Sequence, residues 1–295
     1  MEPAIRAEGV HKAFSSVVAV DGLDLRVERG EIFGFLGPNG AGKTTTLRMI
    51  ADLLRPDRGV LRVLGSSPHD ARPRVGYLPE ERGLYRDLGV MECLVYFAQL
   101  RGVSRWVAAR RAGALLERLG LADRARAPVR ELSRGLQQKA QIAATLMHEP
   151  ELVIFDEPFQ GLDPVNVEVV RRLIQDLAGE GRTVVVCAHE MSLVESLCGR
   201  LAMIYRGRIV LTGELTAIRA QFSPDAFDVL PAPVAEHWPE VGSVEAIPGG
   251  SRLFLRTGAS SSDLLRRLAA SGMSVTEVSR VRLPLESIFL RVVGS

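Results

Sequence analysis

A glycine-rich segment near the N-terminus constrains the fold of this chain more than any other feature. It matches the pattern G-x-x-x-x-G-K-[ST] and reads Gly37-Pro38-Asn39-Gly40-Ala41-Gly42-Lys43-Thr44-Thr45. An apolar run at 31–36 predicts a buried strand before it, and helical spacing of apolar residues over 44–54 predicts a helix after it. Glycines let consecutive backbone N–H groups converge on phosphate oxygens, and the helix N-terminus adds its dipole. The segment therefore predicts a phosphate-binding loop in which Lys43 reaches the β- and γ-phosphates of a nucleotide and Thr44 ligates Mg²⁺.

Composition and charge restrict the class of protein further. The 295 residues carry a net charge of +2, which argues against a protein held to nucleic acid by its overall electrostatic field. No apolar run approaches the roughly 18 residues that would span a bilayer, and no secretory signal is visible. Cys93, Cys187 and Cys198 lack metal-type spacing. We therefore expect a soluble, cytoplasmic chain with one large domain or two unequal ones.

A second chemical element follows the apolar run at 152–155, where Asp156 and Glu157 leave a predicted parallel strand. A carboxylate at such a position beside a phosphate-binding loop can hold the Mg²⁺ shell, which assigns Asp156. Glu157 is then placed to polarise an attacking water. By itself an Asp-Glu pair after a strand is usually a solvated strand end, so the assignment depends on the phosphate-binding loop.

Further motifs follow in a fixed order. The segment Leu132-Ser133-Arg134-Gly135-Leu136-Gln137-Gln138-Lys139 precedes the Asp-Glu pair, and Gly161-Leu162-Asp163 and then His189 follow it. Over about residues 4–215 this order resembles the ATP-binding subunit of an ATP-binding cassette (ABC) transporter. The resemblance places the family's signature at 132–136, its D-loop at 161–163 and its switch histidine at His189.

The resemblance also implies roles for individual residues. Phe14 stands where an aromatic ring stacks on adenine, and His189 would hold the γ-phosphate. Ser133 and Gly135 are the groups that the family aims at the γ-phosphate bound by a partner subunit. Asp163 belongs to the predicted nucleotide site with them. Taken singly, Phe14 and His189 would more often be core or strand-end residues.

Three positions depart from the family pattern. Arg134 and Leu136 stand where the signature usually has Gly and Gln, and Glu80 replaces the Q-loop glutamine. Glu80 can still contact Mg²⁺ or the water, although it adds negative charge near the phosphates, and the alternative is a solvated glutamate in an acidic loop. The segment Leu78-Pro79-Glu80-Glu81-Arg82-Gly83-Leu84-Tyr85, the Gln-Gln-Lys after the signature and a small C-terminal domain resemble the sodium-efflux and drug-export branch of ABC-2-type exporters.

The expected fold is α/β: a P-loop ATPase domain with a mixed sheet, an antiparallel β subdomain and a helical insertion, followed by a small α+β domain. We predict the ATP-binding domain at 1–215, with the insertion at about 90–150. A linker is expected at 216–224, where Ser223-Pro224 marks a break, and an accessory domain at 225–295. Within this accessory domain we expect two strands, a helix at 262–270, a further strand and a final helical piece.

The expected activity is hydrolysis of ATP to ADP and phosphate, with ATP and Mg²⁺ as cofactors. Because the chain has one cassette, it should form a head-to-tail dimer with a second copy. It should also dock on integral membrane permease subunits at the inner face of the cell membrane, with no nucleic-acid partner. One alternative is a non-transport ABC ATPase acting on ribosomes or DNA. Another is a nucleotide-binding regulator with little turnover.

Overall fold

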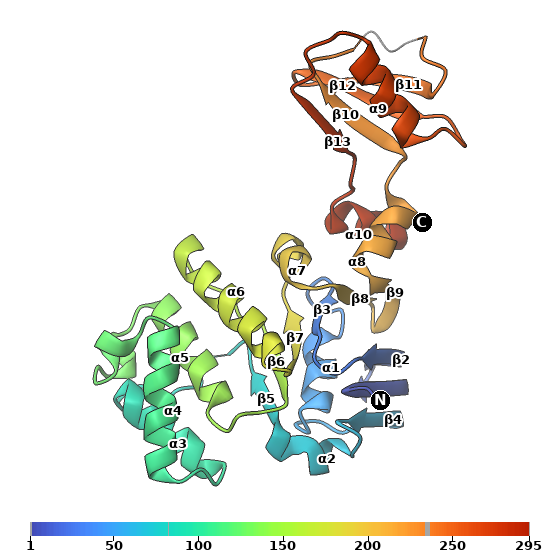
Figure 1. The fold of residues 1–295 in the computed structure, drawn as a ribbon. Coiled ribbons are helices and arrows are strands. Elements are labelled where there is room, and N and C mark those ends of the chain that lie inside the picture. The colour runs from blue at the N-terminus through green and yellow to red at the C-terminus, as the bar shows by residue number, and fades with distance from the viewer. Residues whose placement is uncertain (1, 82, 234–236, 295) are drawn as a thin grey trace. The chain divides into compact units, whose positions relative to one another are not determined.

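The computed structural model describes residues 2–81, 83–233 and 237–294, which divide into two compact units (Figure 1). Unit 1 comprises Met1–Leu215 and Phe289–Ser295, and unit 2 comprises Thr216–Ile288. Unit 1 holds every residue that the sequence predicts for the site.

The centre of unit 1 is a six-stranded sheet with the order β5-β6-β7-β3-β8-β9. The first five strands in this order are parallel, and β9 pairs with β8 in an antiparallel hairpin. The strands β3, β6 and β7 are almost wholly buried, because their apolar runs are covered on both faces. The bounds are β3 Ile32–Leu36, β5 Val75–Leu78, β6 Leu152–Asp156, β7 Thr183–Cys187, β8 Arg200–Tyr205 and β9 Arg208–Glu214.

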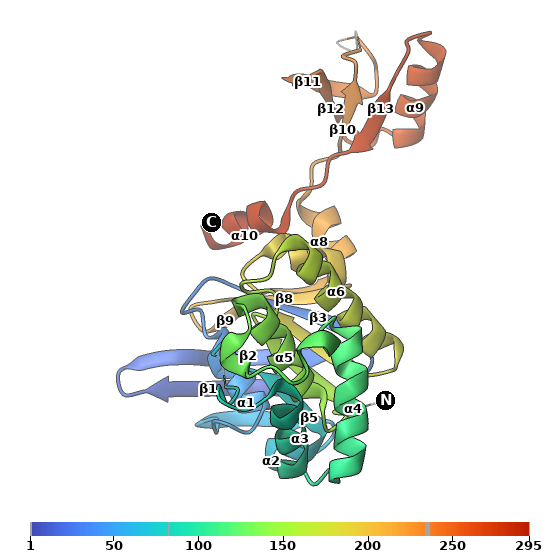
Figure 2. The same ribbon diagram turned by 90° about the vertical axis from the view of Figure 1, so that its left-hand side faces the viewer.

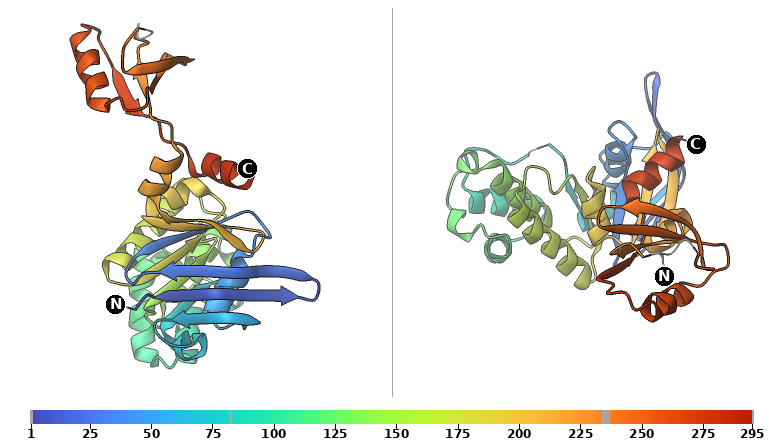
Figure 3. Two further views of the ribbon diagram at one scale, coloured as in Figure 1. Left: turned by 90° about the vertical axis from the view of Figure 1, so that its right-hand side faces the viewer. Right: turned by 90° about the horizontal axis from the view of Figure 1, so that it is seen from above.

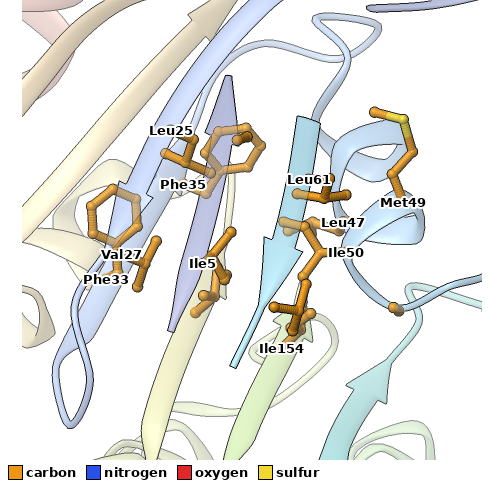
Figure 4. Packing of buried hydrophobic residues seen from close by; sticks show 14 of the residues in the cluster. Ile5, Leu25, Val27, Phe33, Phe35, Leu47, Met49, Ile50, Leu61 and Ile154 are labelled. Atoms are coloured by element: carbon orange, nitrogen blue, oxygen red, sulfur yellow. The ribbon is translucent and has the colours of Figure 1, made fainter. Parts of the chain in front are cut away.

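A second, antiparallel sheet of unit 1 contains β1 Ile5–Phe14, β2 Val17–Val27 and β4 Arg58–Val63, in the order β2-β1-β4. Figure 3 shows the blue strands β1 and β2 side by side. Along β1 the buried and exposed residues alternate at first, as the alternating sequence predicts for a half-buried strand. Figure 4 shows this sheet's inner residues packed with the six-stranded sheet and the first helix in one core, including Ile5, Leu25, Val27, Phe33, Phe35, Leu47, Met49, Ile50, Leu61 and Ile154.

The helices of unit 1 include the predicted insertion, where α3, α4 and α5 lie together (green in Figure 2). Their buried residues recur at helical spacing, as in Ala108, Ala112 and Leu116 of α4. The bounds are α1 Lys43–Ile50, α2 Pro68–Ala71, α3 Val90–Leu100, α4 Arg105–Arg118, α5 Arg134–Leu146, α6 Pro164–Gly179 and α7 Met191–Leu197, with short 3₁₀ turns at Arg72–Arg74, Ala122–Arg124 and Val129–Glu131.

Unit 2 is built on an antiparallel sheet with the order β11-β12-β10-β13. The amphipathic helix α9 buries Leu264 and Leu268 in a core shared with Phe227, Val229 and Leu253. The bounds are α8 Leu215–Phe222, β10 Ala226–Leu230, β11 Val241–Ile247, β12 Gly250–Leu255, α9 Ser261–Ala270, β13 Glu277–Arg280 and α10 Leu285–Gly294; α8 and α10 each cross a unit boundary.

The α/β fold class is confirmed, whereas the secondary structure of three segments differs from what the sequence suggests. The helix predicted over 44–54 ends at Ile50, because the chain turns at Asp52 with a positive φ of 58°. The linker predicted at 216–224 is mostly the helix α8, whose Leu215 and Ile218 are buried three residues apart. The sequence predicts two strands before the helix at 262–270, whereas the described residues form three, β10, β11 and β12. None of the helices in the described ranges is long and apolar enough to cross a membrane.

Candidate nucleotide-binding site

The predicted motifs meet because three neighbouring strands end at one edge of the sheet. In the parallel pairs, Phe35 of β3 and Asp156 of β6 both lie opposite Cys187 of β7. The loop after β3, the Asp-Glu pair after β6 and His189 after β7 therefore emerge together. The carboxyl ends of strands in an open α/β sheet are where ligands bind.

Close packing shapes the glycine-rich loop. A Cβ on Gly37 would lie 2.2 Å from the carbonyl oxygen of Ile204, and one on Gly42 would lie 2.3 Å from that of Ala19. No real Cβ tolerates such distances, so both positions require glycine. The Lys43 ammonium donates to the carbonyl oxygens of Gly37 (2.7 Å) and Pro38 (3.1 Å), inside the loop that it closes. Helix α1 starts here with Gly42 in a left-handed conformation and no side-chain cap, which leaves its first N–H groups available to an anion.

A cavity of about 560 Å³ lies over this loop. Its walls come from the start of β2, the glycine-rich loop and the loops after β5, β6 and β7. The lining residues are Val17, Val18, Ala19, Asn39, Gly40, Gly42, Lys43, Thr44, Thr45, Glu80, Asp156, Glu157, Gln160 and His189.

The two strand-end carboxylates in this cavity have different surroundings. Asp156 is buried, and its Oδ2 accepts a hydrogen bond from the hydroxyl of Tyr77 at 3.4 Å. Burial, with the nearby Asp156, raises the pKa of Tyr77 to about 12, so the hydroxyl stays a donor. Glu157 is also buried, and its Oε2 lies 2.8 Å from Nδ1 of His189. Burial raises the pKa of Glu157, although the contact with His189 acts in the opposite direction.

The donor set of the cavity suits Mg²⁺ bound together with a phosphate chain. Among the described residues no group of three or more His, Cys, Asp and Glu side chains could hold a metal ion by itself. Mg²⁺ needs no such cage, since it usually takes one or two carboxylates, waters and substrate phosphates. The hydroxyl of Thr44 and the carboxylates of Asp156 and Glu80 line the same cavity and are oxygen donors of the required kind.

Three predicted site residues lie elsewhere in unit 1. Ser133 caps the N-terminus of α5, where its Oγ accepts from the N–H of Leu136 at 3.3 Å. Asp163 caps α6 in the same way through the N–H of Asn166, a bond that lowers the pKa of Asp163. Gly135 packs against the loop before α6, since a Cβ on Gly135 would lie 3.2 Å from the oxygen of Gly161. These residues are absent from the lining of the cavity in their own chain.

The residue that the sequence predicts to stack on adenine does not line the cavity, whereas residues close to it in the chain do. Phe14 ends β1 with its side chain 45% exposed, 5.5 Å from the Lys12 ammonium, and is not among the lining residues. Val17, Val18 and Ala19 are lining residues, and the two valines are exposed apolar side chains. Gln160 also lines the cavity and was not among the predicted site residues, although it lies only three residues after Glu157 in the chain.

Comparisons with known proteins decide the family. Residues 20–160 match the family model described as ABC transporter. The chain is 44% identical over 214 residues to YhaQ of Bacillus subtilis (strain 168), an uncharacterized ABC transporter ATP-binding protein, with 72% of each protein covered. This chain belongs to the family of ABC transporter ATP-binding proteins. The resemblance seen in the sequence is thereby confirmed, and this ABC protein is a P-loop ATPase that binds ATP.

Two further similarities cover this ABC ATPase more fully. It is 33% identical over 314 residues to the daunorubicin resistance ATP-binding protein DrrA3 of Streptomyces coeruleorubidus, which covers 99% of this chain and 96% of that one. A solved structure described as the ATP-binding subunit of an ABC transporter aligns with a TM-score of 0.69 at 30% identity, over 74% of this chain and 93% of the other. The relatives therefore include a drug-resistance type that extends through unit 2.

Proposed function

We propose that this ABC ATPase hydrolyses ATP to power an exporter through a separate integral membrane permease. The observation that carries the proposal is the single cavity that gathers Lys43, Asp156, Glu157 and His189 at the end of the parallel strands. The near full-length similarity to a daunorubicin resistance protein supports export as the direction of transport. We place the protein at the inner face of the cell membrane, where such a permease would hold it. We also propose that the part of the predicted accessory domain that lies in unit 2, residues 225–288, acts as an accessory domain.

The charged and hydroxyl residues of the cavity have proposed parts in hydrolysis. Lys43 and the loop amides neutralise charge on the β- and γ-phosphates, and Thr44 and Asp156 hold Mg²⁺, with Glu80 near it. When bound, Mg²⁺ supplies charge stabilisation to the phosphate oxygens. Glu157 polarises the attacking water, while His189, held at 2.8 Å from Glu157, orients the γ-phosphate. Phe14, which is exposed at the end of β1, stacks on adenine in this proposal.

The active form is proposed to be a head-to-tail dimer. Ser133 and Gly135 lie outside the cavity of their own chain, yet both are at the N-terminus of a 13-residue helix, where donors accumulate. In a two-fold dimer each signature would complete the site of the other copy. Asp163, in the loop packed against Gly135, then lies at the interface of the two chains.

A partly exposed aromatic cluster at the start of the helical insertion is the proposed docking surface for the permease. Tyr85, Tyr96 and Phe97 form it, with ring centroids 5.4 to 6.0 Å apart, and Leu100 nearby is 62% exposed. Exposed apolar patches of this kind usually mark interaction sites. Tyr85 is five residues after Glu80, so one loop connects the nucleotide cavity to this surface.

Replacing Tyr85 and Tyr96 together by Ala tests the proposed function. We expect roughly tenfold less copurification with membranes that contain the permease, since buried tyrosines often dominate binding energies. The ATPase rate of the isolated protein should stay unchanged, because neither ring touches the cavity. Trp106→Ala is the matched control, an aromatic residue that is 72% exposed on α4 and outside the cluster. Wild-type protein that copurifies with ribosomes or DNA instead of membranes would support the non-transport alternative.

Glu80→Gln tests the proposed link between the metal and the docking loop. The substitution restores the common family residue and removes one negative charge from the cavity that Asp156 and Glu157 also line. We expect the Mg²⁺ concentration for half-maximal ATPase to rise about two- to tenfold, since one oxygen donor near the metal loses its charge. Stimulation by permease membranes should weaken while the fold stays intact. If the Mg²⁺ titration of Glu80→Gln superimposes on the wild-type curve, Glu80 has no role at the metal and is a solvated loop residue.

A further inference from the structure

Helix α5 carries two buried glutamines. Gln138 and Gln141 are 3% and 5% exposed, and their three-residue spacing puts both on one face of the helix. A buried amide without hydrogen bonds costs free energy, so such side chains persist where they find specific partners. The partners here are backbone groups of two loops that line the cavity, the loop that carries Glu157 and the loop that carries Glu80.

Gln138 holds the backbone of Glu157. Its Nε2 donates to the carbonyl oxygens of Glu157 at 3.1 Å and of Pro158 at 3.3 Å. Glu157 has a φ of 57°, a left-handed conformation that is strained for a non-glycine residue. Its N–H donates to the oxygen of Cys187 at 2.8 Å, so the strained residue is tied on both sides. The direction of the Glu157 carboxylate therefore depends on a bond from α5.

Gln141 holds the loop around Glu80. Its Nε2 donates to the carbonyl oxygens of Glu81 at 2.8 Å and Pro79 at 3.3 Å, on either side of Glu80. Its Oε1 accepts from the N–H of Gly83 at 3.4 Å. One amide thus makes three contacts to a single loop. The same helix face fixes the backbone at both carboxylates.

We infer that Gln138 and Gln141 are positioning residues that join the signature end of α5 to the loops bearing Glu157 and Glu80. The inference rests on the proposed function. Ser133, which would meet the ATP of the partner copy, caps the N-terminus of α5, and the two amides lie one and two turns further along the helix. ATP bound by one copy would thereby fix the orientation of the Glu157 and Glu80 carboxylates in the other copy's site. The two sites would be coupled through α5.

The main test compares the steady-state ATPase kinetics of full-length Gln138→Leu and Gln138→Glu with wild type. Neither change touches the phosphate-binding loop, so we expect kcat to fall about tenfold or more while KM for ATP stays within about twofold. Gln138→Glu at pH 8 puts a carboxylate against two carbonyl oxygens and should be equally slow. At pH 6 a protonated carboxyl can donate again, so the ratio of its activity to that of wild type should rise.

The control is Gln175→Leu, which changes an exposed glutamine on α6 and should leave kcat and KM unchanged. A folded Gln138 variant whose kinetics match this control, or a Gln138→Glu to wild-type ratio that is flat with pH, overturns the inference alone. Gln138→Glu, which keeps the side-chain volume, carries the test if Gln138→Leu does not fold. Absence of ATP turnover in the wild-type protein would overturn the proposed function and this inference together.

The second arm concerns Gln141 and its loop. Gln141→Leu should raise the Mg²⁺ requirement in the same direction as Glu80→Gln, and the double variant should add little to either change. Residues that act through one another show such non-additivity, whereas independent residues add. Fully additive shifts would overturn the assignment of Gln141.

Discussion

Lys43→Ala is expected to reduce ATPase activity at least about 100-fold and to weaken ATP binding about tenfold or more. The Lys43 ammonium is the only lysine charge among the residues lining the described cavity, and it lies on two carbonyl oxygens of the phosphate-binding loop. Steady-state ATPase and binding of a fluorescent ATP analogue would measure the two losses. Lys43→Arg should also fail, because a forked guanidinium does not fit where a compact ammonium closes the loop.

The matched control for Lys43 is Lys12→Ala. Lys12 pairs with Asp57 at 2.7 Å on the antiparallel sheet and does not line the cavity. The Lys12→Ala substitution removes the same charge from the chain and should leave ATP binding and turnover at wild-type levels. Wild-type binding and turnover in Lys43→Ala would refute the phosphate-binding loop.

Glu157→Gln should abolish hydrolysis, to about 1% of wild type or less, while ATP binding is retained. The amide keeps the shape of the side chain and can still accept from His189, but it cannot take a proton from water. Bound ATP should then hold two copies together, which size-exclusion chromatography with ATP and Mg²⁺ would detect as a dimer. Glu117→Gln on α4, an exposed carboxylate, is the control. Unchanged ATPase activity in Glu157→Gln would mean that another group activates the water.

The raised pKa of Glu157 predicts how ATPase activity and stability change with pH. Burial raises the pKa of Glu157 above its ordinary 4.5, so wild-type ATPase should begin to fall as pH drops toward this raised pKa. The Glu157 carboxylate binds a proton more readily in the folded chain than in the unfolded chain. The stability that this protonation contributes is lost as pH rises through the folded pKa. At neutral pH Glu157→Gln should therefore be at least as stable as wild type toward urea, and its advantage should shrink on acidification.

The parts of the site that the sequence predicted are those fixed by local geometry. Gly37 and Gly42 leave no room for a Cβ, and Asp156 follows a strand whose apolar run is readable. The parallel register that puts Phe35 and Asp156 opposite Cys187 then brings the motifs together without further information. Motifs whose backbone conformation is set by the local sequence therefore predicted the phosphate-binding loop and the strand-end carboxylate.

The parts that the sequence did not predict depend on tertiary contacts. Gln138 and Gln141 are readable in the sequence as polar residues in a helix, but their partners are carbonyl oxygens of loops 19 to 62 residues away in the chain. The left-handed φ of Glu157 has no sequence signal, since such a conformation is usual for glycine. Helix α8 was read as linker because Ser223-Pro224 marks its end, whereas the burial of Ile218 that stabilises it comes from packing.

The central claim is that each ATP is hydrolysed between Lys43 and Glu157 of one copy and Ser133 of another. Mixing a Lys43→Ala chain with a Ser133→Asp chain tests it directly, since aspartate preserves the cap of α5 but repels the γ-phosphate. Each variant alone has two defective sites, whereas a mixed head-to-tail dimer has one complete site. We predict that the mixture recovers ATPase activity, up to roughly a quarter of wild type after random exchange, while the double variant remains inactive. A mixture no more active than its separate components would contradict the shared site.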